Sequence, residues 1–359
     1  MTAFRSFASD NHAGVHPEVL AAVGAANTDH AVAYGEDPWT ARLDDLVREE
    51  LGDQAVTYPV FNGTGANVVG LSAMLPRWGA VVAGEASHVN ADEQGAPERV
   101  GGIKVIPVPS VLGKIGPDAV LANAGALGNV HHAQPLAVLI TQSTELGTLY
   151  TPAEIRAVAD AAHDHGMRLF LDGARLANAA AALDVPLRAL TTDVGVDALS
   201  LGGTKNGAMA AEAVVLLNPD AADGLAYVRK GQMQLASKMR YVSAQLVALL
   251  ERPGDGGPAL WRRSAQYANE MAARLRSALD DDVASGRVRD LAFVAPTEVN
   301  ALFVALPREA ADEIRRSHPF YDFAPGPTPE TVVSRWMCAW DTTSDDVARL
   351  LETVRRVLG

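Results

Sequence analysis

The sequence lacks several features that would place the protein outside the reducing interior of a cell. Its one cysteine, Cys338, leaves no possibility of an internal disulfide, as is usual for cytoplasmic proteins. It has no run of about 18 apolar residues that could cross a bilayer. Its first residues show no basic segment followed by an apolar core, so they do not resemble a signal peptide. We therefore expect a soluble cytoplasmic protein without a membrane partner.

Positive charge is also scarce. The chain has 30 lysines and arginines against 43 aspartates and glutamates, which gives a net charge of −13. Because such a surface repels phosphate backbones, we expect no nucleic-acid partner, although a local basic pocket could still hold a small anion. No pattern in the sequence predicts a metal site, and none identifies ligands for a monovalent cation.

What is present is enough for more than one hydrophobic core. Of the 359 residues, 48% are hydrophobic and 20% are charged, and this length favours about two domains. Proline and glycine concentrate in the segment ERPGDGGPALW, which begins at Glu251 and predicts a boundary. We expect an N-terminal arm joined to the large domain (residues 1–15), a large cofactor-binding domain (residues 16–252) and a small C-terminal domain (residues 253–359).

Short apolar runs alternate with helical patterns between about residues 55 and 218. The runs are AVTYPVF from Ala55, AVVAGE from Ala80, IKVIPVP from Ile103, LAVLITQ from Leu136, RLFLDGA from Arg168, VDALSLGG from Val196 and EAVVLLN from Glu212. This alternation predicts an α/β fold with a mainly parallel, doubly wound sheet. After residue 252, two strand-like runs between two helical patterns predict a smaller α+β domain.

Two polar residues follow predicted strands whose ends should meet. LFLDGAR places Asp172 where one strand stops, and SLGGTKNG places Lys205 in a glycine-rich loop after a later strand. Ligands of open α/β sheets bind at the carboxyl ends of strands, so both side chains can line one crevice. A lysine amine can hold the aldehyde of a pyridoxal cofactor, and a buried carboxylate can stabilise its protonated ring nitrogen. Singly, either residue could be a helix cap or a solvated lysine; their joint placement favours a cofactor site.

Two further segments could complete such a site. FNGTGAN places Gly63, Thr64 and Gly65 at the start of a predicted helix, where backbone N–H groups and a hydroxyl suit a phosphate. A plain glycine turn with a threonine cap is the alternative interpretation. His88 follows the run AVVAGE, where an imidazole could stack on the cofactor ring or simply be a surface residue.

Together these motifs resemble those of the L-threonine aldolases, and more narrowly the low-specificity and phenylserine aldolase branch. In the family's order they are SDN at Ser9, YGEDPWT at Tyr34, FNGTGAN, ASH at His88, TE at Glu145, DGAR, GGTKNG, ASKMR at Lys238 and RWMCAWDTT at Arg335. They span nearly the whole chain. The resemblance implies the aspartate aminotransferase fold (type I) of pyridoxal 5′-phosphate enzymes. It also implies a homotetramer, a dimer of dimers with active sites shared between subunits.

The resemblance assigns cofactor contacts to matching positions. Lys205 would be the Schiff-base lysine and Asp172 the partner of the ring nitrogen. Arg175 would contact the ring hydroxyl, although from its position alone it could also brace Asp172. His88 would stack on the ring, and Gly63 and Thr64 would contact the phosphate. Arg229 in YVRKGQMQ is our choice for a further phosphate contact, with Lys230 and Arg240 as alternatives.

The resemblance also assigns substrate contacts. Ser9 and Arg335 would hold the substrate carboxylate, and the planar fork of an arginine matches a carboxylate in two hydrogen bonds. Tyr34 would reach the active site of the neighbouring subunit. Without the resemblance, Arg335 would be read as an exposed strand arginine.

One departure from the family leaves the general base open. Many threonine aldolases carry a histidine in an NTHNG segment after the central strand, whereas this chain has STELG at residues 143–147. The glutamate of that segment, Glu145, can take the hydroxyl proton of a substrate only with a raised pKa or through a water. His88 and His131, in the run NVHHAQP, are the other candidates. A histidine at the entrance of a strand is the alternative interpretation of His131.

The sequence therefore predicts a carbon–carbon lyase. It would cleave L-threonine, L-allo-threonine and other L-β-hydroxy-α-amino acids, including phenylserine, to glycine and an aldehyde. The nearest alternative is another enzyme with the same cofactor, such as a β-eliminating lyase or an aminotransferase. The missing GxGxxG argues against a nicotinamide oxidoreductase. The residues gathered around Lys205 argue against a non-catalytic scaffold.

Overall fold

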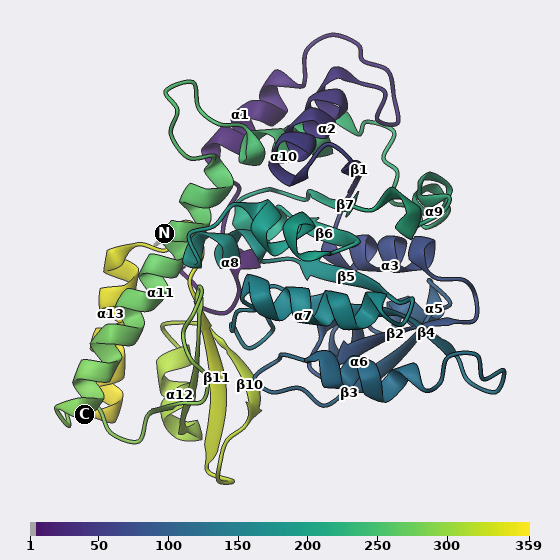
Figure 1. Cartoon of the computed structure of the whole chain (residues 1–359). Helices are drawn as coiled ribbons and strands as arrows, with labels where there is room; N and C mark the ends of the chain where they lie inside the picture. Colours follow the sequence, from purple (N-terminus) through teal and green to yellow (C-terminus); the bar gives the residue numbers. More distant parts are fainter. Residues whose placement is uncertain (1–4) are drawn as a thin grey trace.

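The computed structural model describes residues 5–359, and the first four residues of the predicted arm lie outside this range. It contains a seven-stranded sheet flanked by helices and a four-stranded antiparallel sheet nearer the C-terminus (Figure 1). The strands of the large sheet are β1 (Val56–Val60), β2 (Gly79–Gly84), β3 (Lys104–Val108), β4 (Gln134–Thr141), β5 (Arg168–Gly173), β6 (Ala198–Gly202) and β7 (Glu212–Leu216). Each overlaps one of the seven apolar runs, which confirms the predicted strands.

The large sheet is parallel except at one strand. Its order is β1-β7-β6-β5-β4-β2-β3, and β7 runs antiparallel to both of its neighbours. The prediction of a mainly parallel sheet is confirmed, with β7 departing from it. A crossover between parallel strands needs a dozen or more residues. Because only residues 203–211 separate β6 from β7, these two strands pair as antiparallel neighbours instead.

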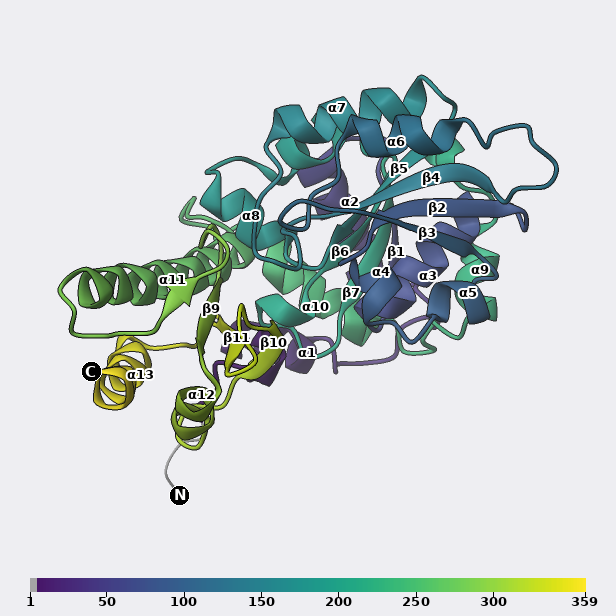
Figure 2. The same cartoon turned by 90° about the horizontal axis from the view of Figure 1, so that it is seen from below.

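Helices cover both faces of the large sheet (Figure 2). They are α1 (Pro17–Ala25), α2 (Pro38–Leu51), α3 (Gly63–Met74), α4 (His88–Ala91), α5 (Ala96–Arg99), α6 (Pro117–Ala124), α7 (Pro152–His163), α8 (Leu176–Ala182), α9 (Leu225–Gly231) and α10 (Arg240–Leu250). Side chains alternate along a strand, so Leu169 and Leu171 pack in one core cluster and Phe170 in the other, beside α3. A Cβ at Gly70 of α3 would lie 2.5 Å from the Phe170 ring, so the glycine lets this helix approach the sheet closely.

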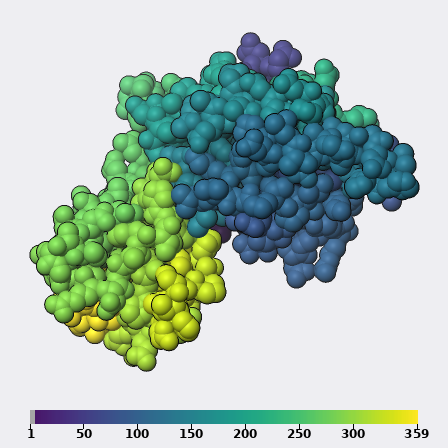
Figure 3. Space-filling view, turned by 60° about the horizontal axis from the view of Figure 1, so that its bottom comes forward, coloured from purple at the N-terminus to yellow at the C-terminus, as the bar shows by residue number. Residues whose placement is uncertain are grey.

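The C-terminal part of the chain forms the second, smaller sheet with its own helices. Its strands are β8 (Ala292–Phe293), β9 (Ala301–Pro307), β10 (Tyr321–Pro325) and β11 (Thr331–Met337), and its helices are α11 (Leu260–Ala284), α12 (Arg308–Arg315) and α13 (Ser344–Leu358). The sheet has the order β10-β11-β9-β8, and its buried core includes Trp336. In the space-filling view this part forms a lobe beside the body of the large sheet (Figure 3).

The N-terminal segment joins the two sheets. Phe7 is buried in the core of the small sheet, and its backbone bonds to Pro319 and Met337. We expected this arm to join the large domain, but Phe7 packs on the C-terminal lobe. Further along, the N–H of His16 donates to the carbonyl of Gly207 in the large part. The predicted division at residues 15 and 252 stays a prediction. Among residues 5–359, no helix is long and apolar enough to cross a membrane.

Candidate active site

Two adjacent parallel strands bring Asp172 and Lys205 to the same edge of the large sheet. Asp172, near the end of β5, pairs in register with Ser200 of β6. Lys205 follows the end of β6 in a short 3₁₀ turn (Thr204–Asn206). The loop that carries Lys205 leads directly into β7, so both ends of this loop are fixed at one edge of the sheet.

The carboxylate of Asp172 is buried and hydrogen-bonded on both oxygens. Oδ2 accepts a hydrogen bond of 2.9 Å from Nδ2 of Asn67, and Oδ1 accepts one of 3.0 Å from the N–H of Ala174. The hydroxyl of Ser200 donates to Oδ1 at 3.4 Å. These donors fix the orientation of the carboxylate and compensate for its burial.

Lys205 reaches a cavity of about 300 Å³. The other lining residues are Asn11, Phe61, Asn62, Gly63, Thr64, His88, Ala174, Thr204, Met209, Ala210 and Glu212. Burial lowers the pKa of the Lys205 amine, and the nearby charge of Arg175 lowers it further, while Asp10 and Asp172 act in the opposite direction. Asp172 does not line the cavity itself, but it accepts a hydrogen bond from Ala174, which does.

The amino terminus of α3 opens onto this cavity. Asn62 caps the helix, with its side-chain oxygen accepting from the N–H of Gly65 at 2.7 Å. The first N–H groups of a helix have no partner inside it, and the first two residues of α3, Gly63 and Thr64, line the cavity. A helix start with free N–H groups suits a phosphate.

Gly65 lies against the side chain of Gln234, a contact that the sequence analysis did not predict. A Cβ at Gly65 would lie 2.4 Å from Cδ of Gln234, so a larger residue here would displace that amide. Oε1 of Gln234 in turn accepts a hydrogen bond of 3.1 Å from the N–H of Phe61. Gln234 therefore braces the loop before α3 from the outside.

Two carboxylates, the buried Glu93 and the partly buried Glu145, hold His88. Oε1 of Glu145 accepts the backbone N–H of His88 at 3.0 Å and the hydroxyl of Thr141 at 2.8 Å. The ring Nδ1 of His88 lies 3.0 Å from Oε1 of Glu93, and this hydrogen bond raises the pKa of His88. Burial raises the pKa of Glu145 to about 7.

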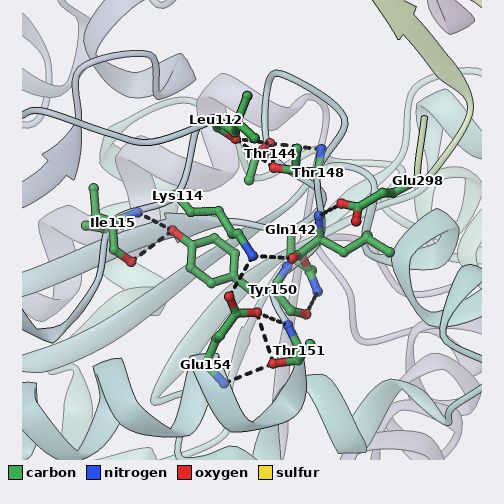
Figure 4. A network of polar contacts seen from close by, with 11 residues as sticks. Leu112, Lys114, Ile115, Gln142, Thr144, Thr148, Tyr150, Thr151, Glu154 and Glu298 are labelled. Atoms are coloured by element: carbon green, nitrogen blue, oxygen red, sulfur yellow. Dashed lines mark hydrogen bonds and ion pairs between the residues drawn. The ribbon is translucent and has the colours of Figure 1, made fainter. Parts of the chain in front are cut away.

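The segment that carries Glu145 is fixed by a polar network (Figure 4). Gln142 and Tyr150 exchange two hydrogen bonds of 2.8 and 3.0 Å between side chain and backbone. The hydroxyl of Tyr150 accepts from the N–H of Ile115 at 2.7 Å. Glu298, between β8 and β9 of the small sheet, accepts from the N–H of Leu149 at 2.8 Å. Glu145 thus sits in a segment anchored to both parts of the molecule.

A second cluster joins the N-terminal segment to both sheets. Arg175 donates two hydrogen bonds, of 2.7 and 2.9 Å, to the carboxylate of Asp10, so it braces Asp10 and forms no hydrogen bond with Asp172. Arg335, on β11, donates to the carbonyl of Ala8 at 3.2 Å, while its buried Nε has no partner. Burial lowers the pKa of Arg335, and the charge of Arg175 adds to that effect.

Some predicted site residues lie outside the cavity that Lys205 lines. Ser9 caps a short turn, where its hydroxyl accepts from the N–H of Asn11 at 3.2 Å. Tyr34 is half exposed, at 50%, with Nζ of Lys230 over its ring at 4.7 Å. The roles proposed for Ser9 and Tyr34 remain predictions.

The basic residues considered for the phosphate have other partners. Arg229 donates to the carbonyl of Pro59 at 3.2 Å, and Arg240 donates to the carbonyl of Asp29 at 3.1 Å. Neither residue lines the cavity, nor does Lys230. The phosphate contact assigned to Arg229 therefore stays a prediction without support from a cavity contact.

The structure places His131 away from Lys205 of the same chain and gives no support to its predicted role as a general base. His131 is exposed and precedes β4, whereas Glu145 follows the end of that strand. An eight-residue strand spans roughly 26 Å, so His131 lies at the opposite edge of the sheet from Lys205. A base must come within hydrogen-bond reach of the proton it removes.

Several polar residues of the site escaped the sequence analysis. They are the partly buried Gln234 and the buried residues Asp10, Asn67, Glu93 and Glu212. Asp10 and Asn67 belong to the motifs SDN and FNGTGAN, and their place in these motifs was the available signal. No local pattern distinguishes Glu93, Glu212 or Gln234 from solvated residues, because their partners are distant in the sequence.

Comparison with known proteins gives concordant likenesses. A family model described as beta-eliminating lyase matches residues 6–306. The low specificity L-threonine aldolase of Pseudomonas aeruginosa is 37% identical over 357 residues, which cover 99% of this chain and 98% of that protein. A protein of the same description from Pseudomonas sp. (strain NCIMB 10558) is 37% identical over 356 residues, which cover 99% of this chain and 98% of that one.

Solved structures agree. A threonine aldolase of Leishmania major is 28% identical with a TM-score of 0.90, covering 99% of this chain and 100% of that chain. A TDC of Oryza sativa, described with PLP and tryptamine, is 15% identical with a TM-score of 0.72, covering 96% of this chain and 81% of that chain. This second likeness is one of fold alone. The predicted aspartate aminotransferase fold (type I) is confirmed, and the chain belongs to the beta-eliminating lyase family.

Proposed function

We propose that this chain uses pyridoxal 5′-phosphate to cleave L-threonine, L-allo-threonine and other L-β-hydroxy-α-amino acids, including phenylserine, into glycine and an aldehyde. The observation that carries the proposal is the pairing of a partly buried amine, Lys205, with a buried carboxylate, Asp172, at adjacent strand ends. It occurs in a chain that is 37% identical over its full length to low specificity L-threonine aldolases.

The residues around the cavity fit the chemical groups of this cofactor. Lys205 offers an amine to the aldehyde, and its lowered pKa favours the neutral, nucleophilic form. Asp172 is a fixed carboxylate for the ring nitrogen. The free N–H groups of Gly63 and Thr64 suit the phosphate. When bound, the cofactor supplies the electron sink for the carbon–carbon bond that breaks.

The chain's own residues would orient the substrate. Arg335 is the candidate for the substrate carboxylate, because its buried Nε has no protein partner and a second N–H group holds only the carbonyl of Ala8. Ser9, one residue on from Ala8, would share that carboxylate. Fixing the carboxylate determines which bond at the α-carbon faces the cofactor, and so which bond breaks.

Glu145 is the stronger of the two remaining candidates for the base. Its carboxylate is partly buried, and this burial raises its pKa to about 7, close to the pH at which a base works best. The backbone of His88 and the hydroxyl of Thr141 hold it in place. His88 lines the cavity and is assigned to the face of the cofactor ring.

The assembly and the compartment follow the same proposal. Tyr34 is half exposed and outside the cavity of its own chain, which supports the proposal that it completes the site of a neighbouring subunit in a homotetramer. Light scattering of the purified protein would give the oligomeric state. The single cysteine supports a cytoplasmic location.

A product assay tests the function. After incubation with pyridoxal 5′-phosphate, the protein is given both enantiomers of threonine, allo-threonine and phenylserine, and glycine and the matching aldehyde are measured. The family description favours β-elimination as the second candidate, which would release ammonia and a keto acid. Ammonia without glycine would overturn the aldolase proposal in favour of that second activity.

A further inference from the structure

One amide joins two buried carboxylates next to the cavity. Nδ2 of Asn67 donates to Oδ2 of Asp172 at 2.9 Å and to Oε1 of Glu93 at 2.9 Å. An amide nitrogen has two N–H donors, so each carboxylate takes one of them. Turning the amide over would place its oxygen against both carboxylates, and the orientation of Asn67 is therefore fixed.

Glu93 extends this arrangement to the imidazole of His88. Its side chain is fully buried in the turn between α4 and α5. The same oxygen that accepts from Asn67 also lies 3.0 Å from Nδ1 of His88, and its other oxygen, Oε2, has no protein partner. Burying a charged carboxylate costs free energy. The presence of Glu93 at this position therefore suggests a role beyond packing.

We propose that Glu93 is a positioning residue that links His88 to Asp172 through Asn67, fixes the proton of His88 on Nδ1 and leaves its Nε2 as a proton acceptor at the cavity. The proposal deepens the proposed function and rests on it. Glu93 touches neither the cavity nor the cofactor site directly, so it acts on the reaction only through its two neighbours.

The chemistry of imidazole explains why a carboxylate is required. A neutral imidazole has one N–H and one bare nitrogen, and the partner of the first nitrogen decides the state of the second. A carboxylate can only accept, so Nδ1 must carry the hydrogen. A glutamine could turn either its oxygen or its N–H₂ group toward the ring and would leave the tautomer unspecified.

The charge of Glu93 also links this residue to His88. The bond to Glu93 is the largest influence that raises the pKa of His88; Asp172 also raises it, whereas burial and the charge of Lys205 lower it. Glu145 faces the backbone of the same histidine. Removing the charge of Glu93 should therefore lower the pKa of His88 and of any basic nitrogen beside it.

The test uses the holoenzyme with Glu93→Gln, and Glu98→Gln as a matched control at an exposed glutamate on α5. Two quantities are measured: the pH midpoint of the visible absorbance of the bound cofactor, and the pH profile of kcat for cleavage. We expect both to move to lower pH by roughly one unit in Glu93→Gln, to move less in Glu93→Asp and to stay unchanged in Glu98→Gln. Unchanged midpoints in a folded Glu93→Gln enzyme would overturn the proposal.

Two further variants separate positioning from folding. In a His88→Phe background the shift in the pH profile of kcat caused by Glu93→Gln should disappear, because the group it acts on is gone; a persisting shift would contradict the link. Asn67→Ala should alter the absorbance spectrum through Asp172, and an unchanged spectrum would contradict the link through Asn67. If the wild-type protein binds cofactor but does not cleave threonine, the function fails, and the absorbance midpoint still decides the inference.

Discussion

Two groups of polar residues at the site are held very differently. The ring group, Asn67, His88, Glu93 and Asp172, forms one connected set of hydrogen bonds. The carboxylate group, Asp10, Arg175 and Arg335, contains one saturated pair, but the guanidinium of Arg335 has a single bond to a backbone carbonyl and a buried Nε without a partner.

The difference teaches how such a site divides its work. Side chains that would hold a resident cofactor are fixed by each other before anything binds, which keeps them in one geometry. A side chain that would receive a substrate at each turnover keeps donors in reserve, because a donor already paired cannot bind without first losing its partner. Substitutions in the two groups should therefore give different kinetic signatures.

The largest effect is expected at Lys205, on which both groups depend. Lys205→Ala removes the amine that would hold the cofactor, so cleavage should fall by several orders of magnitude. The visible absorbance of the lysine-bound cofactor should disappear as well. A Lys205→Ala enzyme with substantial activity would refute the central assignment, and Lys104→Ala, at an exposed lysine outside the cavity, is the control.

Asp172 tests the ring group. Asp172→Asn keeps the shape of the side chain but removes the charge that would stabilise the protonated ring nitrogen, so kcat should fall by roughly 10²–10³-fold. Cofactor should remain bound, as absorbance after gel filtration would show. Near-normal kcat would mean that Asp172 serves only to anchor Ala174 and α3.

Glu145 tests the general base. Since burial raises its pKa to about 7, the carboxylate is protonated below that pH and ionised above it. A base works only when ionised, so kcat of the wild type should rise as the pH passes through about 7. Glu145→Gln should lower kcat by roughly 10²-fold and remove this ionisation from the pH profile. An unchanged profile would reassign the base to His88.

Arg335 tests the carboxylate group and should give the smallest loss. Arg335→Ala removes the charge-assisted bonds to the substrate carboxylate, so KM for the amino acid should rise by roughly 10–100-fold, with a smaller change in kcat. Arg335→Lys should recover part of the affinity, because it restores charge without the planar fork. Equal losses of kcat in the two variants would place Arg335 with the ring group.

The sequence predicted the ring side of the site better than the rest. Asp172, Lys205 and the glycines of FNGTGAN lie at strand ends and a helix start, where local patterns are strong. Gln234 and Glu93 were missed because their partners, Phe61 and Asn67, come from other elements. The position of His131 could not be predicted, because the local sequence does not show at which end of the sheet a histidine beside a strand lies. The antiparallel strand β7 could be read only from the short link before it.

That short link has a consequence for the reactive amine. Lys205 lies in a loop bounded on both sides by paired strands, and at its neck Glu212 accepts the N–H groups of Gly203 and Thr204 at 3.1 and 3.3 Å. A loop tied at both ends has few conformations to search. The conformational entropy of the loop that positions the amine is therefore lost once, when the sheet forms. It is not lost again in each catalytic cycle.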